Sequence, residues 1–378
     1  MILLRKIFTY IKQFGLSRTL SYIRANIHMN SHKNFKGSEW KNVNCRDQDD
    51  KERIVAIIGS GRFAFSTIAH FLRNSNKNFL RCVYSPGIKR AVSLCKYYNG
   101  LYVPSDWRDI LKDERVKLVF ITSPAETHAE YAIECIKAGK NVYIEKPPVI
   151  SESQLTLLKE SMINNPKCKV FLGFNRTSSE IFTELEKFIL NESGFISANC
   201  MMSVNESLAI KNMPGTEHAI LEHLCHFTDI ILRLVTLDRA FPCVITPDEM
   251  PVNKCTLRFS FSIVFADKSH ISFKYTEIPN FLEGMEEVID LSKGNLIARL
   301  SNFQELQIEL PGEKVNKKTL YRDHGHKASI NEAFVSTIDN IGDGESIEHI
   351  EATSKLYLKI VEAMSKNTST EVVLDQAT

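Results

Sequence analysis

The sequence predicts an α/β protein of two domains, with a doubly wound parallel sheet in the N-terminal domain and a large open mixed sheet in an α+β C-terminal domain. Its 378 residues exceed what one hydrophobic core usually serves. Short apolar runs alternate with amphipathic stretches between Arg53 and Met162, and strand-like segments follow one another between Thr256 and Leu300. We place an N-terminal extension and linker at residues 1–50, the first domain at 51–172 and the second at 173–378.

The composition is that of an ordinary soluble protein, with 43% hydrophobic and 24% charged residues. No stretch approaches the roughly 18 consecutive apolar residues of a membrane span. A formal charge of +2 lacks the basic excess that nucleic-acid binding requires, so we exclude a nucleic-acid partner. The nine cysteines are odd in number and never spaced as CxxC, which indicates a reducing cytoplasm and argues against a disulfide framework.

Residues 1–38 form a basic amphipathic segment with seven basic residues and no acidic residue. We expect its apolar side to dock on this protein or on a sister subunit. Peripheral contact with an anionic membrane surface is the alternative. The polar, aperiodic residues 29–52 predict a linker to the globular part of the chain.

The first domain is predicted as a series of strand–helix units, which form a parallel sheet with right-handed crossovers. Ser151 followed by Gln154 is a capping-box pattern, and Gly139 lies where the preceding helix has to stop. The predicted strands are 54–58, 79–84, 118–121 and 141–144, and the predicted helices are 63–73, 88–98, 126–138 and 151–162.

The second domain is predicted to hold a sheet with one covered face, because apolar and polar residues alternate along its strands. The predicted strands are 256–265, 270–275, 286–291 and 296–300, and the predicted helices are 178–190, 217–234, 326–340 and 347–364.

A glycine-rich turn, GSGRFA at residues 59–64, follows the first strand. Gly59 permits a tight turn, Gly61 lets the backbone approach a pyrophosphate, and the next helix offers free amides to that anion. Ala64 replaces the third glycine of the usual pattern, where helix packing needs only a small residue. The turn predicts a Rossmann dinucleotide-binding site.

The residues after the second strand favour NADP over NAD. An acid is expected here when the pocket binds the free ribose 2′-hydroxyl of NAD, whereas Ser85, Lys89 and Arg90 suit a 2′-phosphate. A merely solvated helix face is the alternative for Lys89 and Arg90.

The segment VYIEKPPVI at residues 142–150 places Glu145 and Lys146 at the carboxyl edge of the sheet, where doubly wound folds bind ligands. Pro147 allows a cis peptide. An ordinary lysine at a strand end is the alternative for Lys146.

Five segments in the same order resemble the Gfo/Idh/MocA oxidoreductases, the family of glucose-fructose oxidoreductase and inositol dehydrogenase. The resemblance spans residues 53–365 and is strongest for the branch found in bacterial surface-polysaccharide pathways. It implies NADP or NAD as cofactor, no metal, a sugar or nucleotide-sugar substrate, and a homo-oligomer, dimer or tetramer, assembled through the second domain. The segments are GSGRFA, FITSPAETHAEYAIECIKAGKNVYIEKPP, FLGFNR, CHFTDIILRL and DHGHKASINEAF.

The resemblance also implies roles for single residues. Lys146 contacts nicotinamide and substrate, and His226 is the catalytic histidine. Glu222 stands where relatives carry an aspartate, and we expect it to orient His226 from the same helix face. The expected cofactor contacts are Gly59, Ser60, Gly61, Arg62, Phe63, Ser85, Lys89, Arg90, Thr122, Ser123, Pro124, His128, Glu145, Lys146 and Arg176.

Together these features predict hydride transfer between nicotinamide and a sugar hydroxyl or carbonyl in polysaccharide precursor biosynthesis, with His226 as acid and base. One alternative is a nucleotide-binding regulator or scaffold of the same fold, because the glycine-rich approach to His226 usual in the family is nearly absent. Another is a zinc-dependent hydrolase that uses His218, Glu222 and His226.

Overall fold

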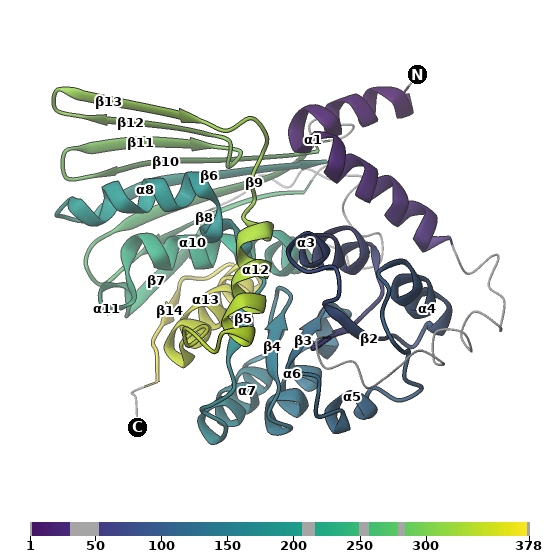
Figure 1. The fold of residues 1–378 in the computed structure, drawn as a ribbon. Coiled ribbons are helices and arrows are strands. Elements are labelled where there is room, and N and C mark those ends of the chain that lie inside the picture. Colours follow the sequence, from purple (N-terminus) through teal and green to yellow (C-terminus); the bar gives the residue numbers. More distant parts are fainter. Residues whose placement is uncertain (1, 31–52, 206–215, 249–256, 279–283, 376–378) are drawn as a thin grey trace. The chain divides into compact units, whose positions relative to one another are not determined.

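The computed structural model describes residues 2–30, 53–205, 216–248, 257–278 and 284–375 (Figure 1). It confirms the predicted fold class, with a five-stranded parallel sheet and a nine-stranded mixed sheet. The chain forms two compact units. The parallel-sheet unit contains residues 15–173 and 326–347, and the mixed-sheet unit contains residues 1–14, 174–325 and 348–378. Among the described helices, none combines the length and the apolar character needed to cross a bilayer.

The strands of the parallel-sheet unit follow the order β2-β1-β3-β4-β5, and every pair is parallel. The order reverses between β1 and β3, which is the point where doubly wound sheets bind ligands. All residues of these two strands are buried, as strands covered on both faces require. The bounds are β1 Val55–Ile58, β2 Leu80–Tyr84, β3 Leu118–Ile121, β4 Asn141–Ile144 and β5 Val170–Leu172.

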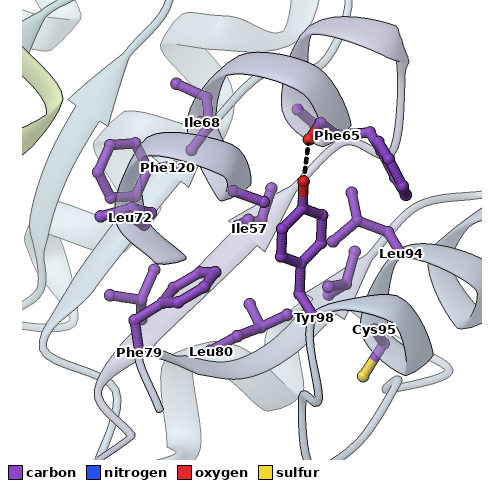
Figure 2. Close-up of a cluster of buried hydrophobic side chains, with 14 of the residues drawn as sticks. Ile57, Phe65, Ile68, Leu72, Phe79, Leu80, Leu94, Cys95, Tyr98 and Phe120 are labelled. Carbon is purple, nitrogen blue, oxygen red and sulfur yellow. Dashed lines mark hydrogen bonds between the residues drawn. The ribbon is translucent and has the colours of Figure 1, made fainter. Parts of the chain in front are cut away.

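Helices cover both faces of this sheet, as Figure 1 shows. On one face, Ile57 and Phe120 pack against Leu72 and Leu94 from two helices (Figure 2). Tyr98 lies in the same cluster and donates a hydrogen bond to the Phe65 carbonyl at 2.6 Å. The helices of this unit are α3 Ala69–Ser75, α4 Ile88–Tyr97, α5 Arg108–Lys112, α6 His128–Lys137, α7 Glu152–Asn164 and α12 His326–Ile338.

The predicted helix ends at Gly139 and Ser151 are confirmed. Gly139 has φ +73°, and beyond it the Lys140 amide donates to the carbonyl of Cys135 at 3.0 Å. Ser151 accepts a hydrogen bond from the Gln154 amide at 3.2 Å, while the Gln154 side chain accepts one from the Ile150 amide at 2.8 Å.

The mixed-sheet unit has the strand order β13-β12-β11-β10-β6-β9-β8-β7-β14. Among the described strands of this sheet, only β6 and β9 pair in parallel. Its helices include α8 Glu180–Asn191, α9 Thr216–Ala219, α10 Cys225–Val235, α11 Leu237–Ala240 and α13 Ile347–Lys366. The strands are β6 Ile196–Asn205, β7 Cys243–Pro247, β8 Arg258–Val264, β9 His270–Ile278, β10 Met285–Lys293, β11 Leu296–Ser301, β12 Glu305–Leu310, β13 Glu313–Lys318 and β14 Thr370–Val372.

The sequence analysis missed β5 of the parallel sheet and β6, β7, β12, β13 and β14 of the mixed sheet. The omission of β6 matters most, because it pairs with β9 on one side and β10 on the other. Its serine, asparagine and alanine residues have weak strand propensity, although alternate positions are buried.

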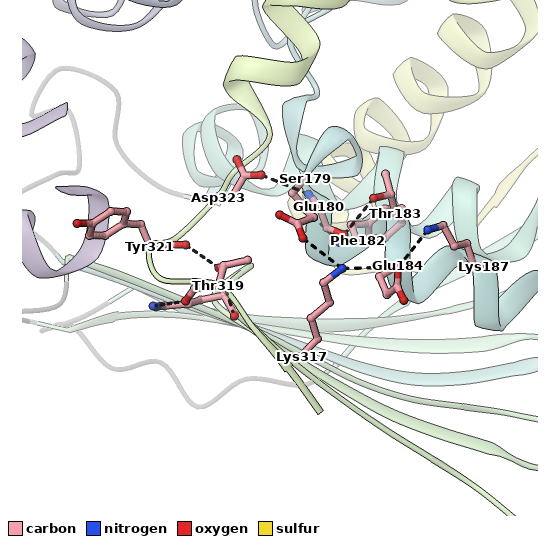
Figure 3. A network of polar contacts seen from close by, with 11 residues as sticks. Ser179, Glu180, Phe182, Thr183, Glu184, Lys187, Lys317, Thr319, Tyr321 and Asp323 are labelled. Atoms are coloured by element: carbon pink, nitrogen blue, oxygen red, sulfur yellow. Dashed lines mark hydrogen bonds and ion pairs between the residues drawn. The ribbon is translucent and has the colours of Figure 1, made fainter. Parts of the chain in front are cut away.

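Ion pairs connect α8 to the edge strand β13 (Figure 3). Lys317 lies 3.2 Å from Glu180 and 3.7 Å from Glu184, which also accepts from Lys187 at 3.1 Å. Ser179 caps α8 by accepting from the Phe182 amide at 3.2 Å. Such half-exposed pairs contribute little stability individually, so the apolar side of α8 holds it on the sheet.

The N-terminal extension is a helix, α1 Ile2–Met29, interrupted at Gly15 with φ 79° and ψ 169°. From Gly15 onward it belongs to the parallel-sheet unit, where Ala25 is fully buried and His28 is 3% exposed. These contacts show that this part of the extension docks on the same chain. The predicted apolar side is not the docked face, since Leu20 and Ile23 remain 41% and 36% exposed. Most of the predicted linker, residues 31–52, lies outside the described residues.

Candidate functional site

The turn after β1 lies against the end of β3. The Gly59 amide donates to the Tyr84 carbonyl at 2.8 Å, and the Thr122 amide donates to the Ile58 carbonyl at 2.8 Å. Gly59 has φ +109°, and a Cβ there would lie 2.5 Å from Thr122 Oγ1 and 2.6 Å from its carbonyl oxygen. Only glycine fits this position, so its role is to hold the turn at the carboxyl edge of the sheet.

Gly61 differs from Gly59, because a Cβ at this residue would meet no atom within 4 Å. The hydroxyl of Ser60 is buried and has no hydrogen-bond partner among the described residues. Helix starts with open backbone and free amides bind phosphate groups. The turn therefore fits the pyrophosphate of a dinucleotide, with Ser60 as a further donor.

The side chains of Arg62 and Phe63 contact protein groups. Arg62 donates to the Tyr22 hydroxyl at 3.2 Å and lies over its ring, 5.3 Å from the centroid. The ring of Phe63 lies 5.6 Å from that of His326. In this structure both side chains have structural contacts. Their backbone amides lie at the start of a helical segment whose first part, Ala64–Ile68, is π-helical and continues into α3.

His28 of α1 is a residue of this site that the sequence analysis missed. Its Nε2 lies 2.9 Å from the Ser60 carbonyl and its Nδ1 lies 2.9 Å from the Ser93 hydroxyl. Burial keeps the pKa of His28 below its usual value, against the opposing effect of the hydrogen bond to Ser60. A neutral ring satisfies both contacts when Nε2 donates and Nδ1 accepts.

The residues after β2 gather around Gly87. A Cβ at Gly87 would lie 3.6 Å from the Arg90 guanidinium and 3.9 Å from the Ser85 hydroxyl. Arg90 is half-buried, whereas Lys89 is exposed. The guanidinium and the hydroxyl thus both lie next to Gly87 at the end of β2, whose last residue, Tyr84, accepts from the Gly59 amide of the glycine turn.

His128 connects the loops after β3 and β4. It is 2% exposed, and its two ring nitrogens lie 2.8 Å from the carbonyl of Ser123 and 2.8 Å from the carbonyl of Pro147. Ser123 also accepts from the Thr127 hydroxyl at 2.8 Å, and Pro124 is exposed at the start of the next turn. Because both ring nitrogens contact backbone, His128 positions the two loops.

Glu145 and Lys146 follow β4, and the Lys146–Pro147 peptide is cis. Glu145 is 8% exposed and packs against Gly173, where a Cβ would lie 3.1 Å from three of its atoms. Lys146 is half-exposed. The glycine of FLGFNR therefore makes room for the glutamate of the EKPP segment, and Lys146 is the more accessible of the two side chains.

Arg176 lies in the mixed-sheet unit, where its guanidinium is 2.6 Å from Glu287. Glu287 is 1% exposed, and its second oxygen lies 3.3 Å from His324. Burial alone would raise the pKa of Glu287, but Arg176 and His324 lower it to about 2. These contacts give Arg176 a structural role in the core of the mixed sheet.

His226 is the second residue of α10 and is 5% exposed. Its ring lies 6.1 Å from that of Phe174. A π-helical segment, Ile220–Leu224, precedes α10 and contains the half-exposed Glu222. The Cys225 amide closes that segment by donating to the Ile220 carbonyl. Glu222 and His226 are therefore separated by a π-to-α junction and not by the regular α-helical turn that the sequence analysis assumed.

A buried polar cluster surrounds the next turn of α10. Asp229 is 1% exposed and lies 2.6 Å from His349 Nε2, and it accepts from the Thr177 hydroxyl at 2.8 Å. Arg233 lies 3.5 Å from the same carboxylate. The cluster links α10 to α13 and to the segment after FLGFNR, and it was not predicted.

No group of three or more histidine, cysteine, aspartate or glutamate side chains is placed to hold a metal ion within the described part of the chain. The His218 side chain, which the zinc hypothesis used, lies outside the described residues.

Most of the parallel-sheet unit is similar to a known protein family. Residues 53–174 match the family model of the Gfo/Idh/MocA oxidoreductases, described as an oxidoreductase family with an NAD-binding Rossmann fold. An inositol 2-dehydrogenase of Salmonella paratyphi B is 30% identical over 136 residues, which are 35% of this chain and 40% of that protein. One of Burkholderia vietnamiensis is 26% identical over 195 residues, 51% of this chain and 57% of that protein. The chain thus spans about half the length of these curated relatives.

Solved structures match over most of the chain. Levoglucosan dehydrogenase in complex with NADH and levoglucosan has a TM-score of 0.70 and 18% identity, covering 85% of this chain and 99% of that one. A dehydrogenase from Clostridium difficile has a TM-score of 0.69 and 19% identity, covering 82% and 99%. These matches show that both units have the fold of those enzymes.

We predict that Gly61→Val leaves the protein folded but weakens dinucleotide binding at least about tenfold, because its side chain would displace charge-assisted hydrogen bonds to the pyrophosphate. Gly59→Ala should instead lower the unfolding free energy by about 2 kcal/mol or more, since its Cβ has no space. Fluorescence titration with NADPH and NADH measures the dinucleotide affinity of each variant, and circular dichroism measures its stability, so the two effects can be distinguished. Unchanged affinity of Gly61→Val would exclude this turn as the pyrophosphate site.

We predict that Glu287→Gln lowers stability by about 3 kcal/mol at neutral pH, because Arg176 would remain buried beside a neutral group. The pKa of Glu287 is depressed from 4.5 to about 2, so its contribution is present above pH 4.5 and is lost as the pH falls towards 2. The difference between wild type and variant should therefore shrink over that range. Glu305→Gln, at a half-exposed pair with Lys318, is the control and should change thermal stability little.

Proposed function

We propose that this chain, whose residues 53–174 match the NAD-binding Rossmann domain of the Gfo/Idh/MocA oxidoreductases, transfers a hydride between nicotinamide and a CH–OH carbon of a sugar. The observation that carries the proposal is the Gly59–Gly61 turn at the reversal point of the sheet, with open space at Gly61 and a buried hydroxyl at Ser60. Both features suit a bound pyrophosphate.

The proposal assigns one task to each of three side chains. When bound, nicotinamide accepts or supplies the hydride. In the oxidative direction His226 takes the proton from the substrate hydroxyl, Lys146 stabilises the negative charge that develops on that oxygen, and Glu222 orients His226. In the reductive direction His226 returns the proton to the carbonyl oxygen. Support comes from the family resemblance of the EKPP and CHFTDIILRL segments and from the half-exposed state of Lys146 and Glu222.

A sugar or cyclic polyol is the proposed substrate class. The relatives and structural neighbours include inositol and levoglucosan dehydrogenases, whose substrates carry several adjacent hydroxyls. The finer proposal, a nucleotide sugar or other precursor of a polysaccharide in the cytoplasm, is supported by the sequence resemblance alone. We also propose NADP as the preferred cofactor, because Ser85 and Arg90 both lie next to Gly87 at the end of β2 and that loop contains no acid.

We predict that the wild-type protein binds NADPH more tightly than NADH and that Lys89→Ala with Arg90→Ala removes the difference. The 2′-phosphate would lose its charge-assisted partners, a loss of about tenfold or more in NADPH affinity. Lys96→Ala, an exposed lysine on the same helix, is the matched control and should leave both affinities unchanged. Tighter binding of NADH by the wild type would contradict the NADP assignment.

We predict that His226→Ala lowers turnover about 10²- to 10⁴-fold, as expected for loss of an acid–base group, without weakening dinucleotide binding. Lys146→Ala should lower turnover as well, and the double variant should lose less than the product of the two losses because both residues act on one oxygen. His223→Ala, half-exposed in the preceding segment, is the control and should stay active.

Multiplicative losses in the double variant would show that the two residues act separately. Tight dinucleotide binding by the wild type without turnover of any sugar would favour the regulator or scaffold alternative.

A further inference from the structure

Helix α1 beyond Gly15 has one face that is docked on the parallel-sheet unit. Ala25 is fully buried on this face, and His28 contacts the Ser60 carbonyl and stacks on Phe65 with ring centroids 4.5 Å apart. Ser21 lies one turn before Ala25 and Arg18 two turns before it. Both donate to the Ser66 carbonyl. These contacts span three turns of the helix and hold its orientation on the domain.

The opposite face of the same helix is apolar and exposed. Leu16 is 59% exposed, Leu20 41%, Ile23 36% and Ile27 68%. Spacings of four, three and four residues place all four side chains in one narrow stripe, about half a turn away from Ala25. We call these four residues the apolar stripe. A helix already docked on its own domain gains nothing for folding from a second apolar face.

Basic residues accompany the stripe, and acidic residues do not. Arg24 is exposed beside it. Residues 1–38 contain seven basic residues and no acidic residue, although the whole chain carries only +2. A helix with an apolar stripe and basic flanks matches a surface of anionic lipid headgroups above an acyl region.

We propose that the apolar stripe of α1 binds an anionic membrane surface and attaches the parallel-sheet unit to it as a peripheral protein. A second copy of the chain fits less well, because a symmetric contact through this face would bring the basic flanks of the two copies together. Four partly exposed side chains also offer less than the roughly 800 Å² per partner of a stable interface. The proposal is independent of the catalytic one.

The test is flotation of the full-length protein with vesicles of phosphatidylcholine, with and without phosphatidylglycerol. The wild type should float only with vesicles that contain phosphatidylglycerol, and raising the salt concentration should release it. Leu20→Glu with Ile23→Glu should reduce the bound fraction at least about tenfold, because both the buried apolar area and the charge balance change.

The matched control is Leu157→Glu with Ile163→Glu, which makes the same change at exposed apolar residues of α7 in the same unit. It should float like the wild type, and both variants should keep the wild-type circular dichroism. Absence of flotation with phosphatidylglycerol vesicles would overturn the proposal, as would equal loss in the control. The remaining outcome is that the wild type does not float and the stripe variant has a changed sedimentation coefficient. That result would identify the stripe as an interface between copies of the chain.

Discussion

At residue 59 the backbone leaves no room for a side chain, because the end of β3 lies 2.5 Å from where a Cβ would stand. This contact between Gly59 and Thr122 joins the two strands at which the order of the sheet reverses. It also sets the direction in which the chain leaves β1, and therefore where the Ser60 hydroxyl, the Gly61 backbone and the next helix start are presented. The geometry that we propose to bind the pyrophosphate is a consequence of this packing.

Buried histidines stabilise the loops around this edge. His28 contacts the carbonyl side of the glycine turn, and His128 connects the loop after β3 to the loop that carries Lys146. Both rings use two nitrogens for contacts within the protein, so they act as positioning residues. A site whose loops are held before a ligand arrives loses less conformational entropy on binding, which suits a cofactor that must be placed within a fraction of an ångström.

Four strands of the parallel sheet could be predicted from the sequence because they are continuous apolar runs separated by helical periodicity, as in Val55–Ile58 and Leu118–Ile121. The fifth, Val170–Leu172, has only three residues and was missed. The mixed sheet was predicted only in part. In β6, residues such as Ser197 and Asn199 lie between small buried ones, and alternation was the only signal. The glycine-rich pattern of residues 59–64 predicted the candidate dinucleotide site. Two features could not be predicted because they depend on tertiary packing and not on spacing along the chain. They are the pairing of Arg176 with Glu287 and the π-helical segment before His226.

The central claim is that the carboxyl edge of the parallel sheet binds a nicotinamide dinucleotide. Native mass spectrometry of the full-length protein with equal concentrations of NADPH and NADH tests it most directly. The account predicts one dinucleotide per chain, displaced by excess of the oxidised form and identified after denaturation as NADP(H) or NAD(H). A protein that remains free of both dinucleotides at millimolar concentration, while folded by circular dichroism, would contradict the account.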